Sequence, residues 1–115
     1  MPSPTSLSYT ARYSYTPSVN FEWDEEKRRT NISDRGLDFA DAWEIFEGPI
    51  LTALDEREDY GEDRWIGIGL LRGLVVVIVF TERSEDRMRI ISLRKALKHE
   101  RIKYEQAIRN GLEAG

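Results

Sequence analysis

The stretch LVVVIVFTER, residues 74–83, is the most strand-like part of the chain. Its apolar run from Leu74 to Phe80 shows no alternation of polar and apolar residues, which is typical of a strand buried on both faces. The run is also far too short to cross a bilayer. We therefore predict that this stretch forms the central strand of a sheet and that neighbouring segments pair with it.

The segments around this stretch carry strand and turn patterns of their own. RWIGIGLL, residues 64–71, alternates, so its isoleucines are expected to point inward, with Gly67 and Gly69 on the opposite face. Arg72 and Gly73 predict a hairpin turn. SEDR at 84–87 predicts a turn, and MRIIS at 88–92 predicts a strand. ILTALDE at 50–56 predicts a short strand. Together these segments predict a meander of about four antiparallel strands.

Helices are expected before and after the meander in the sequence. Asp24 can cap a first helix and Gly36 can end it. Asp38 can cap a second helix, whose core-facing stripe would be Phe39, Ala42, Trp43 and Phe46. Ser92 can cap a last helix over residues 93–110, with a stripe of Leu93, Ala96, Leu97, Tyr104, Ala107 and Ile108 that Glu100 interrupts. The predicted fold class is α+β: two N-terminal helices, the meander and a C-terminal helix, with helices covering one sheet face.

The chain has the length of one domain, with residues 20–110 as its expected body. Residues 1–19 form an N-terminal extension, in which Leu7, Tyr9, Ala11, Tyr13 and Tyr15 share one parity; an added edge strand or a partner-contacting arm is expected there. There is no cysteine for a disulfide or a zinc–thiolate site. No secretory signal is recognisable, so we expect a cytoplasmic protein without membrane contact.

Charge is distributed unevenly along the chain. The net charge is −4, but residues 20–63 carry 15 acidic and five basic side chains, whereas residues 83–103 carry eight basic and three acidic ones. Such asymmetry indicates either that one surface faces an anion or that the two halves neutralise each other across the fold.

Three arginines are expected at one end of the meander. Arg64 begins one strand, Arg83 ends the next and Arg89 begins the third, so antiparallel pairing would bring them together. Converging arginines form an anion site, and one that could stabilise the charge on a phosphorus transition state. The alternative is a structural network in which these arginines pair with Glu82, Glu85, Asp86 and the acidic turn around Gly61.

Cleavage of RNA by its own 2′-hydroxyl would suit this site, since it needs no metal, cofactor or cysteine. Glu62 or Glu82 could act as the base. The acidic turn fits the spacing of no calcium loop. Arg94, Lys95 and Lys98 could extend the contact with RNA, although the first two are expected towards the other end of their strand. Trp65 could stack on a base or pack in the core, and Glu100 is expected to pair with an arginine.

Five blocks of the sequence resemble the BrnT toxin family: FEWDEEKRRTN, GLDFADAWEIFEGP, DYGEDRWIGIG, VVVIVFTER and RMRIISLRKALKHERIKYE, within about residues 20–105. The resemblance implies a RelE-like fold and a ribonuclease toxin that stops translation. It also implies a BrnA-like antitoxin that neutralises the toxin, and promoter DNA bound only through the antitoxin complex. By matching motifs it implies roles for Lys27, Glu62, Arg64, Arg83, Arg89 and Arg94.

Two functions follow from these observations. The first is a metal-independent ribonuclease toxin held inactive by its antitoxin, favoured by the retained arginines. The second is a catalytically inactive relative that binds an antitoxin and takes part in operon autoregulation. The acidic balance favours it, as does Asp34, which stands where the family usually has a lysine. DNA binding by the chain alone is not expected, because the sequence has no helix-turn-helix pattern.

Overall fold

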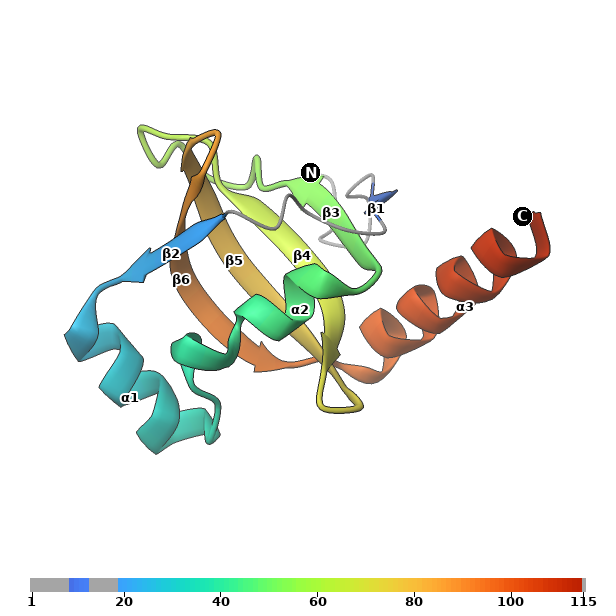
Figure 1. Ribbon diagram of the computed structural model, residues 1–115, viewed down its shortest axis with the longest axis horizontal. Coiled ribbons are helices and arrows are strands. Elements are labelled where there is room, and N and C mark those ends of the chain that lie inside the picture. The colour runs from blue at the N-terminus through green and yellow to red at the C-terminus, as the bar shows by residue number, and fades with distance from the viewer. Residues whose placement is uncertain (1–8, 13–18, 115) are drawn as a thin grey trace.

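The computed structural model describes residues 9–12 and 19–114. One twisted sheet dominates it (Figure 1), and its strands are β1 (Thr10–Arg12), β2 (Asn20–Trp23), β3 (Ile50–Leu54), β4 (Trp65–Leu71), β5 (Leu74–Ser84) and β6 (Arg87–Lys95). Their spatial order is β1-β3-β4-β5-β6-β2. All neighbours are antiparallel except β2 and β6, which are parallel.

The predicted meander is confirmed as the four central strands of this sheet, with β5 in the interior between β4 and β6. Arg72 and Gly73 turn the chain from β4 to β5, both with positive φ, of 52° and 80°. This is the conformation that two-residue hairpins require. The two outer strands come from the start of the sequence: β1 pairs with β3, and β2 pairs with the first half of β6. Leu7, Tyr13 and Tyr15 of the expected N-terminal strand lie outside the described residues.

The first predicted helix is confirmed as α1 (Glu25–Arg35). The Asp24 side chain accepts hydrogen bonds from the backbone N–H groups of Glu26 and Lys27, and Gly36 ends the helix with φ of 71°. α1 lies beside β6 (Figure 1), at the edge that β2 leaves uncovered. There the buried Asn31 side chain accepts from the Leu93 N–H and donates to the Leu37 carbonyl. A polar helix is thus fixed to the sheet by one side-chain amide.

The second helix is split into a 3-10 turn, η2 (Phe39–Asp41), and α2 (Trp43–Glu47), with Asp38 capping the turn as predicted. Phe39, Ala42 and Phe46 are buried, but the prediction for Trp43 is wrong, since it is 47% exposed. A 3-10 turn has three residues per turn. The stripe therefore rotates, and Ile45 takes the core position that Trp43 was expected to fill.

The last helix also starts later than predicted. The structure continues β6 to Lys95, and α3 spans Lys98–Ala114, so Ser92 and Leu93 belong to the strand. A register shift between Val79 and Phe80 of β5 accommodates an extra residue in β6, and Leu93 beyond it is fully buried opposite Ile78. Burial in the core therefore outweighs the helix-like sequence pattern, which placed Ser92 as a cap.

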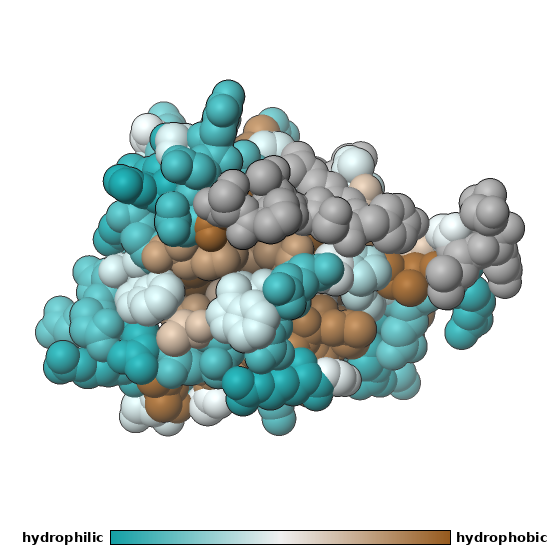
Figure 2. Space-filling model, in the orientation of Figure 1, coloured by the Kyte–Doolittle hydropathy of each residue, from teal (hydrophilic) through white to brown (hydrophobic). Residues whose placement is uncertain are grey.

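The two faces of the sheet are both buried, but by different elements. α2 crosses in front of the sheet in Figure 1, over a core that includes Phe46, Ile78 and Phe80. On the opposite face, α3 packs Tyr104 with Ile68 and Val77. The Tyr104 hydroxyl donates to the Pro49 carbonyl over 2.8 Å. Figure 2 shows hydrophilic residues around the rim of the front face and hydrophobic residues at its centre.

The glycine face of β4 is a core face rather than an outward one, which corrects the sequence expectation. A Cβ atom on Gly69 would lie 2.7 Å from the Ile45 side chain, and one on Gly67 would lie 2.8 Å from Ile50. Both distances are shorter than carbon atoms tolerate. The absence of side chains at these positions leaves room over β4 for Ile45 of α2 and Ile50 of β3. Leu70 shares the face of Ile66 and Ile68, which was expected to point inward, yet it is 42% exposed.

Candidate functional site

A row of polar residues crosses one end of the sheet, on the face opposite the aromatic core. Phe80 and Trp65 pair across β5 and β4, so the same register places Arg64 opposite Thr81. Thr81 pairs with Arg89 on β6, and Arg89 pairs with Glu22 on β2. Because side chains alternate along a strand, these four residues share one face while Trp65 and Phe80 point to the other.

Arg83 joins this row through a carboxylate. The Glu62 side chain lies 3.6 Å from Nε of Arg64 and 3.4 Å from a terminal nitrogen of Arg83. Arg89 lies 4.0 Å from the carboxylate of Glu22. The structure therefore brings Arg64 and Arg83 together around one acid. Arg89 lies in the same row on β6, the strand next to β5.

These ion pairs are longer than the tightest ones of the molecule and similar in length to exposed pairs on α1 and α3, of 3.9 and 3.8 Å. Arg28 and Asp38 approach to 2.8 Å, as do Arg57 and Asp55. Contacts of 3.4–4.0 Å are longer than charge-assisted hydrogen bonds. The side chains of Arg64, Arg83 and Arg89 are between 26% and 44% exposed, so solvent reaches part of each. Among the described residues, this is where arginines converge without a tight acidic partner, and such an arrangement suits a bound anion.

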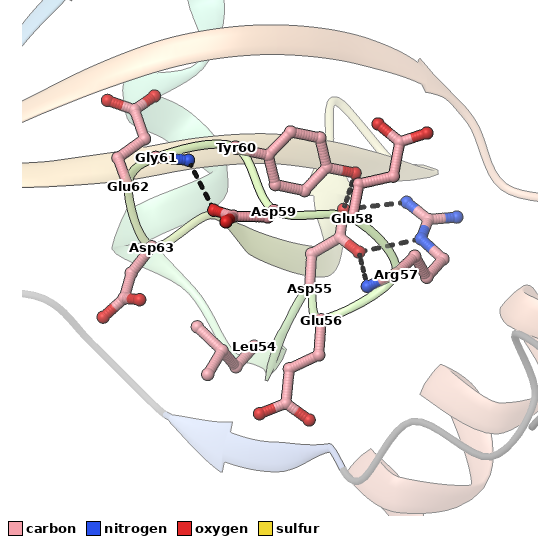
Figure 3. A pocket seen from close by; sticks show the side chains of 10 residues that line it. All are labelled: Leu54, Asp55, Glu56, Arg57, Glu58, Asp59, Tyr60, Gly61, Glu62 and Asp63. Atoms are coloured by element: carbon pink, nitrogen blue, oxygen red, sulfur yellow. Dashed lines mark hydrogen bonds and ion pairs between the residues drawn. The ribbon is translucent and has the colours of Figure 1, made fainter.

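The acidic loop between β3 and β4 supports this row (Figure 3). It surrounds an open pocket of about 670 Å³ lined by residues 54–63. The buried carboxylate of Asp55 accepts hydrogen bonds from the Arg57 guanidinium at 2.8 and 2.9 Å and from the Tyr60 hydroxyl at 3.1 Å. The Arg64 guanidinium lies over the Tyr60 ring, 4.3 Å from its centroid. The loop thus fixes Tyr60, and Tyr60 fixes one face of Arg64.

The pKa shifts in this loop agree with its hydrogen bonds. The hydrogen bonds from Arg57 lower the pKa of the Asp55 carboxyl against the opposing effect of burial. Desolvation, followed by the hydrogen bond to Asp55, raises the pKa of Tyr60. At neutral pH, Asp55 is therefore ionised and Tyr60 is a hydrogen-bond donor, as the geometry requires.

Arg94 lies on the same face but farther along β6. Arg94 pairs with Val77 and Arg89 with Thr81, four positions apart on β5, which corresponds to about 13 Å. Arg94 donates two hydrogen bonds to Glu100, of 2.7 and 2.8 Å, and Glu100 also accepts from the Leu97 N–H. The expected buried partner of Glu100 is therefore Arg94, and the pair joins β6 to the start of α3.

The remaining predicted site residues lie apart from the row. Lys95 ends β6 and Lys98 begins α3, both exposed and at the Arg94 end. Lys27 lies on α1, where it lines a pocket with Ile91 and Ser92 of β6. Trp65 is partly buried against the aromatic core, on the face opposite Arg64. The structure does not bring these four residues to the Glu62 carboxylate.

Three residues of this region were missed by the sequence analysis: Asp55, Tyr60 and Thr81. Asp55 and Tyr60 belong to a loop that reads only as an acidic turn, because their hydrogen bond depends on the loop's conformation. Thr81 could have been found, since it stands two residues before Arg83 and so shares its parity on the predicted strand. Within the described part of the chain, no group of three acidic or histidine side chains is arranged to hold a metal ion.

The chain is similar to known proteins both in sequence and in structure. A family model described as "Ribonuclease toxin, BrnT, of type II toxin-antitoxin system" matches residues 23–100. The structure is similar to the 1.1 Å crystal structure of the Brucella abortus ribonuclease toxin BrnT, with a TM-score of 0.55 and 32% sequence identity. The similarity covers 70% of this chain and 99% of that chain. A search of curated proteins finds no match.

The fold and these matches show that the chain is related to the toxins of type II toxin–antitoxin systems. Within that class, it belongs to the BrnT ribonuclease toxin family. The family prediction and the α+β fold class are thereby confirmed. Membership of a toxin family also implies a cognate antitoxin as partner. None of the helices in the described residues is long and apolar enough to span a membrane.

Proposed function

We propose that this chain is an active endoribonuclease toxin whose site is the end of the sheet that carries Arg64, Arg83 and Arg89. The observation that supports the proposal most strongly is the loose pairing of these arginines with Glu62 and Glu22. Arginines that hold buried carboxylates in this fold form short bonds, such as the one between Arg57 and Asp55. A phosphodiester supplies the negative charge that the three guanidinium groups lack.

The proposed reaction is internal attack of the RNA 2′-hydroxyl on the adjacent phosphorus. The 2′-oxygen loses its proton and forms a bond to phosphorus, and the 5′-oxygen of the next nucleotide leaves and takes up a proton. Charge builds on the non-bridging oxygens, where the arginines stabilise it. Glu62 is the proposed base, because its carboxylate lies between two of the arginines that would hold the phosphate. No metal or cofactor enters this scheme.

Other residues are proposed to extend the contact with RNA. Lys95 and Lys98 are exposed and lie about 13 Å or more along the same strand direction, a distance that a few nucleotides of one RNA strand would span. Arg94 would steer RNA through its charge while remaining bound to Glu100. Lys27 lies on α1 and Trp65 on the sheet face opposite Arg64, so neither belongs to the arginine row. Lys27 would contact the RNA backbone from α1, and Trp65 would stack on a base.

In the cell, we infer, the toxin acts in the cytoplasm, where it inhibits translation by cutting RNA. A BrnA-like antitoxin would neutralise it, and the complex would bind promoter DNA through the antitoxin. The family match supports the antitoxin as partner.

The test of this proposal is induced expression together with cleavage of purified RNA in the presence of a chelator. Wild type should arrest growth and cut RNA, and Arg83→Ala should relieve arrest and lower the cleavage rate at least tenfold. Arg83 is 44% exposed on its side chain, so its removal should leave the fold intact. Arg87→Ala is the matched control, since Arg87 is exposed in the same turn and loses the same charge. Equal activity of the two variants would refute the assignment of the site.

The second candidate function is an inactive member of the family that binds an antitoxin and takes part in autoregulation. Asp34, exposed on α1 and lining the pocket that also contains Lys27, favours this function because its charge would repel a phosphate there. If wild type neither arrests growth nor cuts RNA while the purified chain still binds its antitoxin, this second function is correct.

A further inference from the structure

Two buried hydrogen-bonding groups in the arginine row have no partner in the part of the chain that the structure describes. They are Nε of Arg64 and the hydroxyl oxygen of Thr81. Thr81 is only 2% exposed. Buried polar groups almost always have a partner, and one left without it destabilises the fold. Two such groups in one protein therefore call for an explanation.

The residues that carry these two groups are cross-strand neighbours, Arg64 just before β4 and Thr81 on β5. The register that pairs Trp65 with Phe80 puts Arg64 opposite Thr81, on the face that also carries Arg89. Neighbouring residues across an antiparallel pair have Cβ atoms about 5 Å apart. An Nε–H and a hydroxyl in this position both donate hydrogen bonds, so a single oxygen acceptor between them would satisfy both.

We propose that Arg64 and Thr81 together hold one non-bridging oxygen of the RNA phosphate, which makes Thr81 a substrate-binding residue. The proposal rests on the ribonuclease function proposed above and adds a specific contact to it. Thr81 would contribute a neutral hydrogen bond from the floor of the site, while the arginines contribute charge from its walls. The stacking of Arg64 on Tyr60 fixes the guanidinium plane before RNA arrives, which lowers the entropic cost of binding.

The Glu62 carboxylate governs access to these groups. It lies 3.6 Å from the same Nε atom, too far for a hydrogen bond, and its side chain is 28% exposed. An incoming phosphate competes with Glu62 for both Arg64 and Arg83. When the carboxylate moves aside, the phosphate oxygen enters the space between Arg64 and Thr81, and the displaced Glu62 stays close enough to act on the 2′-hydroxyl.

The experiment compares three threonine variants in purified protein. Thr81→Val removes the hydroxyl at constant shape, Thr81→Ser retains it, and Thr52→Val is the control. Thr52 is as buried as Thr81, but its hydroxyl has a partner, the Thr10 carbonyl at 3.5 Å. The probe is a short RNA oligonucleotide methylated at every 2′-hydroxyl, which binds but cannot be cleaved by internal attack. Its affinity is measured by fluorescence anisotropy, and the thermal midpoint of each variant by circular dichroism.

Thr81→Val should bind the oligonucleotide five- to tenfold more weakly, with a thermal midpoint equal to or above that of wild type. Thr81→Ser should restore most of the affinity, and Thr52→Val should bind like wild type. A Thr81→Val protein with unchanged affinity, or one whose midpoint falls as its hydroxyl is lost, overturns the proposal. Since the probe reports binding alone, Thr81 can pass this test in a chain that cuts no RNA, and can fail it in a chain that does.

Discussion

A single hydrogen atom in place of a side chain decides how closely α2 lies against the sheet. Gly69 sits under Ile45, where an added Cβ would meet the isoleucine methyl at 2.7 Å. The sequence shows the glycine but not the helix above it, and so the glycine face of β4 was predicted to point outward. The error has a physical source: alternation shows which residues share a face, but not which face is covered.

Gly69→Ala should therefore destabilise the protein by about 1–3 kcal/mol, because the core has to shift to accept one methyl group. Urea unfolding measures the change. Gly48→Ala is the control, since nothing lies within 4 Å of a Cβ there and the φ of −112° suits alanine. Similar losses in the two variants would mean that close packing at Gly69 is not the cause.

The residues of the candidate site were only partly predictable. Arg64, Arg83 and Arg89 could be grouped because antiparallel pairing fixes which strand ends meet, and the observed register agrees with that reasoning. Glu62 could be named, but its position between two arginines depends on a loop conformation that no periodic pattern specifies. The way Asp55 positions Tyr60, and Tyr60 positions Arg64, could not be predicted for the same reason.

At the scale of elements, the junction of β6 and α3 shows how tertiary contacts override local sequence. Residues 89–100 read as a short strand followed directly by a helix, yet the strand continues to Lys95. Leu93 gains more from the core than from a helical turn, and Asn31 of α1 accepts a hydrogen bond from its N–H. Sequence periodicity carries no information about a partner 62 residues away.

The Arg94–Glu100 pair at this junction makes stability depend on pH. The hydrogen bonds from Arg94 lower the pKa of Glu100 below its usual value of 4.5. A carboxyl with a depressed folded pKa stabilises the fold above its unfolded pKa, and this contribution is lost as the pH falls through the folded value. The Glu100→Gln substitution should thus lower the free energy of unfolding by about 1–2 kcal/mol at pH 7.

Urea unfolding of wild type and Glu100→Gln from pH 7 to pH 3 measures this effect. The difference in the free energy of unfolding between the two proteins should be constant down to about pH 4.5. It should then shrink, because the wild-type carboxylate becomes protonated. Glu105→Gln, at an exposed ion pair of 3.8 Å one turn further along α3, should differ little from wild type at any pH. A difference that persists undiminished at pH 3 would show that charge is not its origin.

At the scale of the whole molecule, the fully buried contact of α3 with the sheet is Tyr104, beside which Ala107 and Ile108 also pack. Tyr104 is 2% exposed, packs against β4 and β5, and donates to the Pro49 carbonyl just before β3. Most of α3 lies beyond residues 23–100, the part that matches the family. The helix therefore completes the second core from outside the matched region.

Tyr104→Ala should lower the free energy of unfolding by about 3–5 kcal/mol, and Tyr104→Phe by about 1 kcal/mol for the hydrogen bond alone. Chemical denaturation resolves the two contributions. Gln106→Ala, on the exposed side of α3, should stay within about 0.5 kcal/mol of wild type. A small effect of Tyr104→Ala would show that the sheet does not need the helix. Under the proposed function, RNA cleavage by the folded fraction should be unaffected, because Val77, which packs with Tyr104, lies four positions from Thr81 along β5.

The strand order has a consequence for biosynthesis. β1 and β2, both within the first 23 residues, lie at opposite edges of the sheet, while the strands between them come from residues 50–95. A nascent chain therefore emerges from the ribosome with two edge strands that have nothing to pair with. Arg89 cannot meet Glu22 and Thr81 until β6, the last strand among the described residues, has left the exit tunnel. Such non-local pairing folds slowly. Under the proposed function, toxicity would accordingly begin only after β6 has been translated, and a translation product truncated or stalled before β6 carries no assembled site.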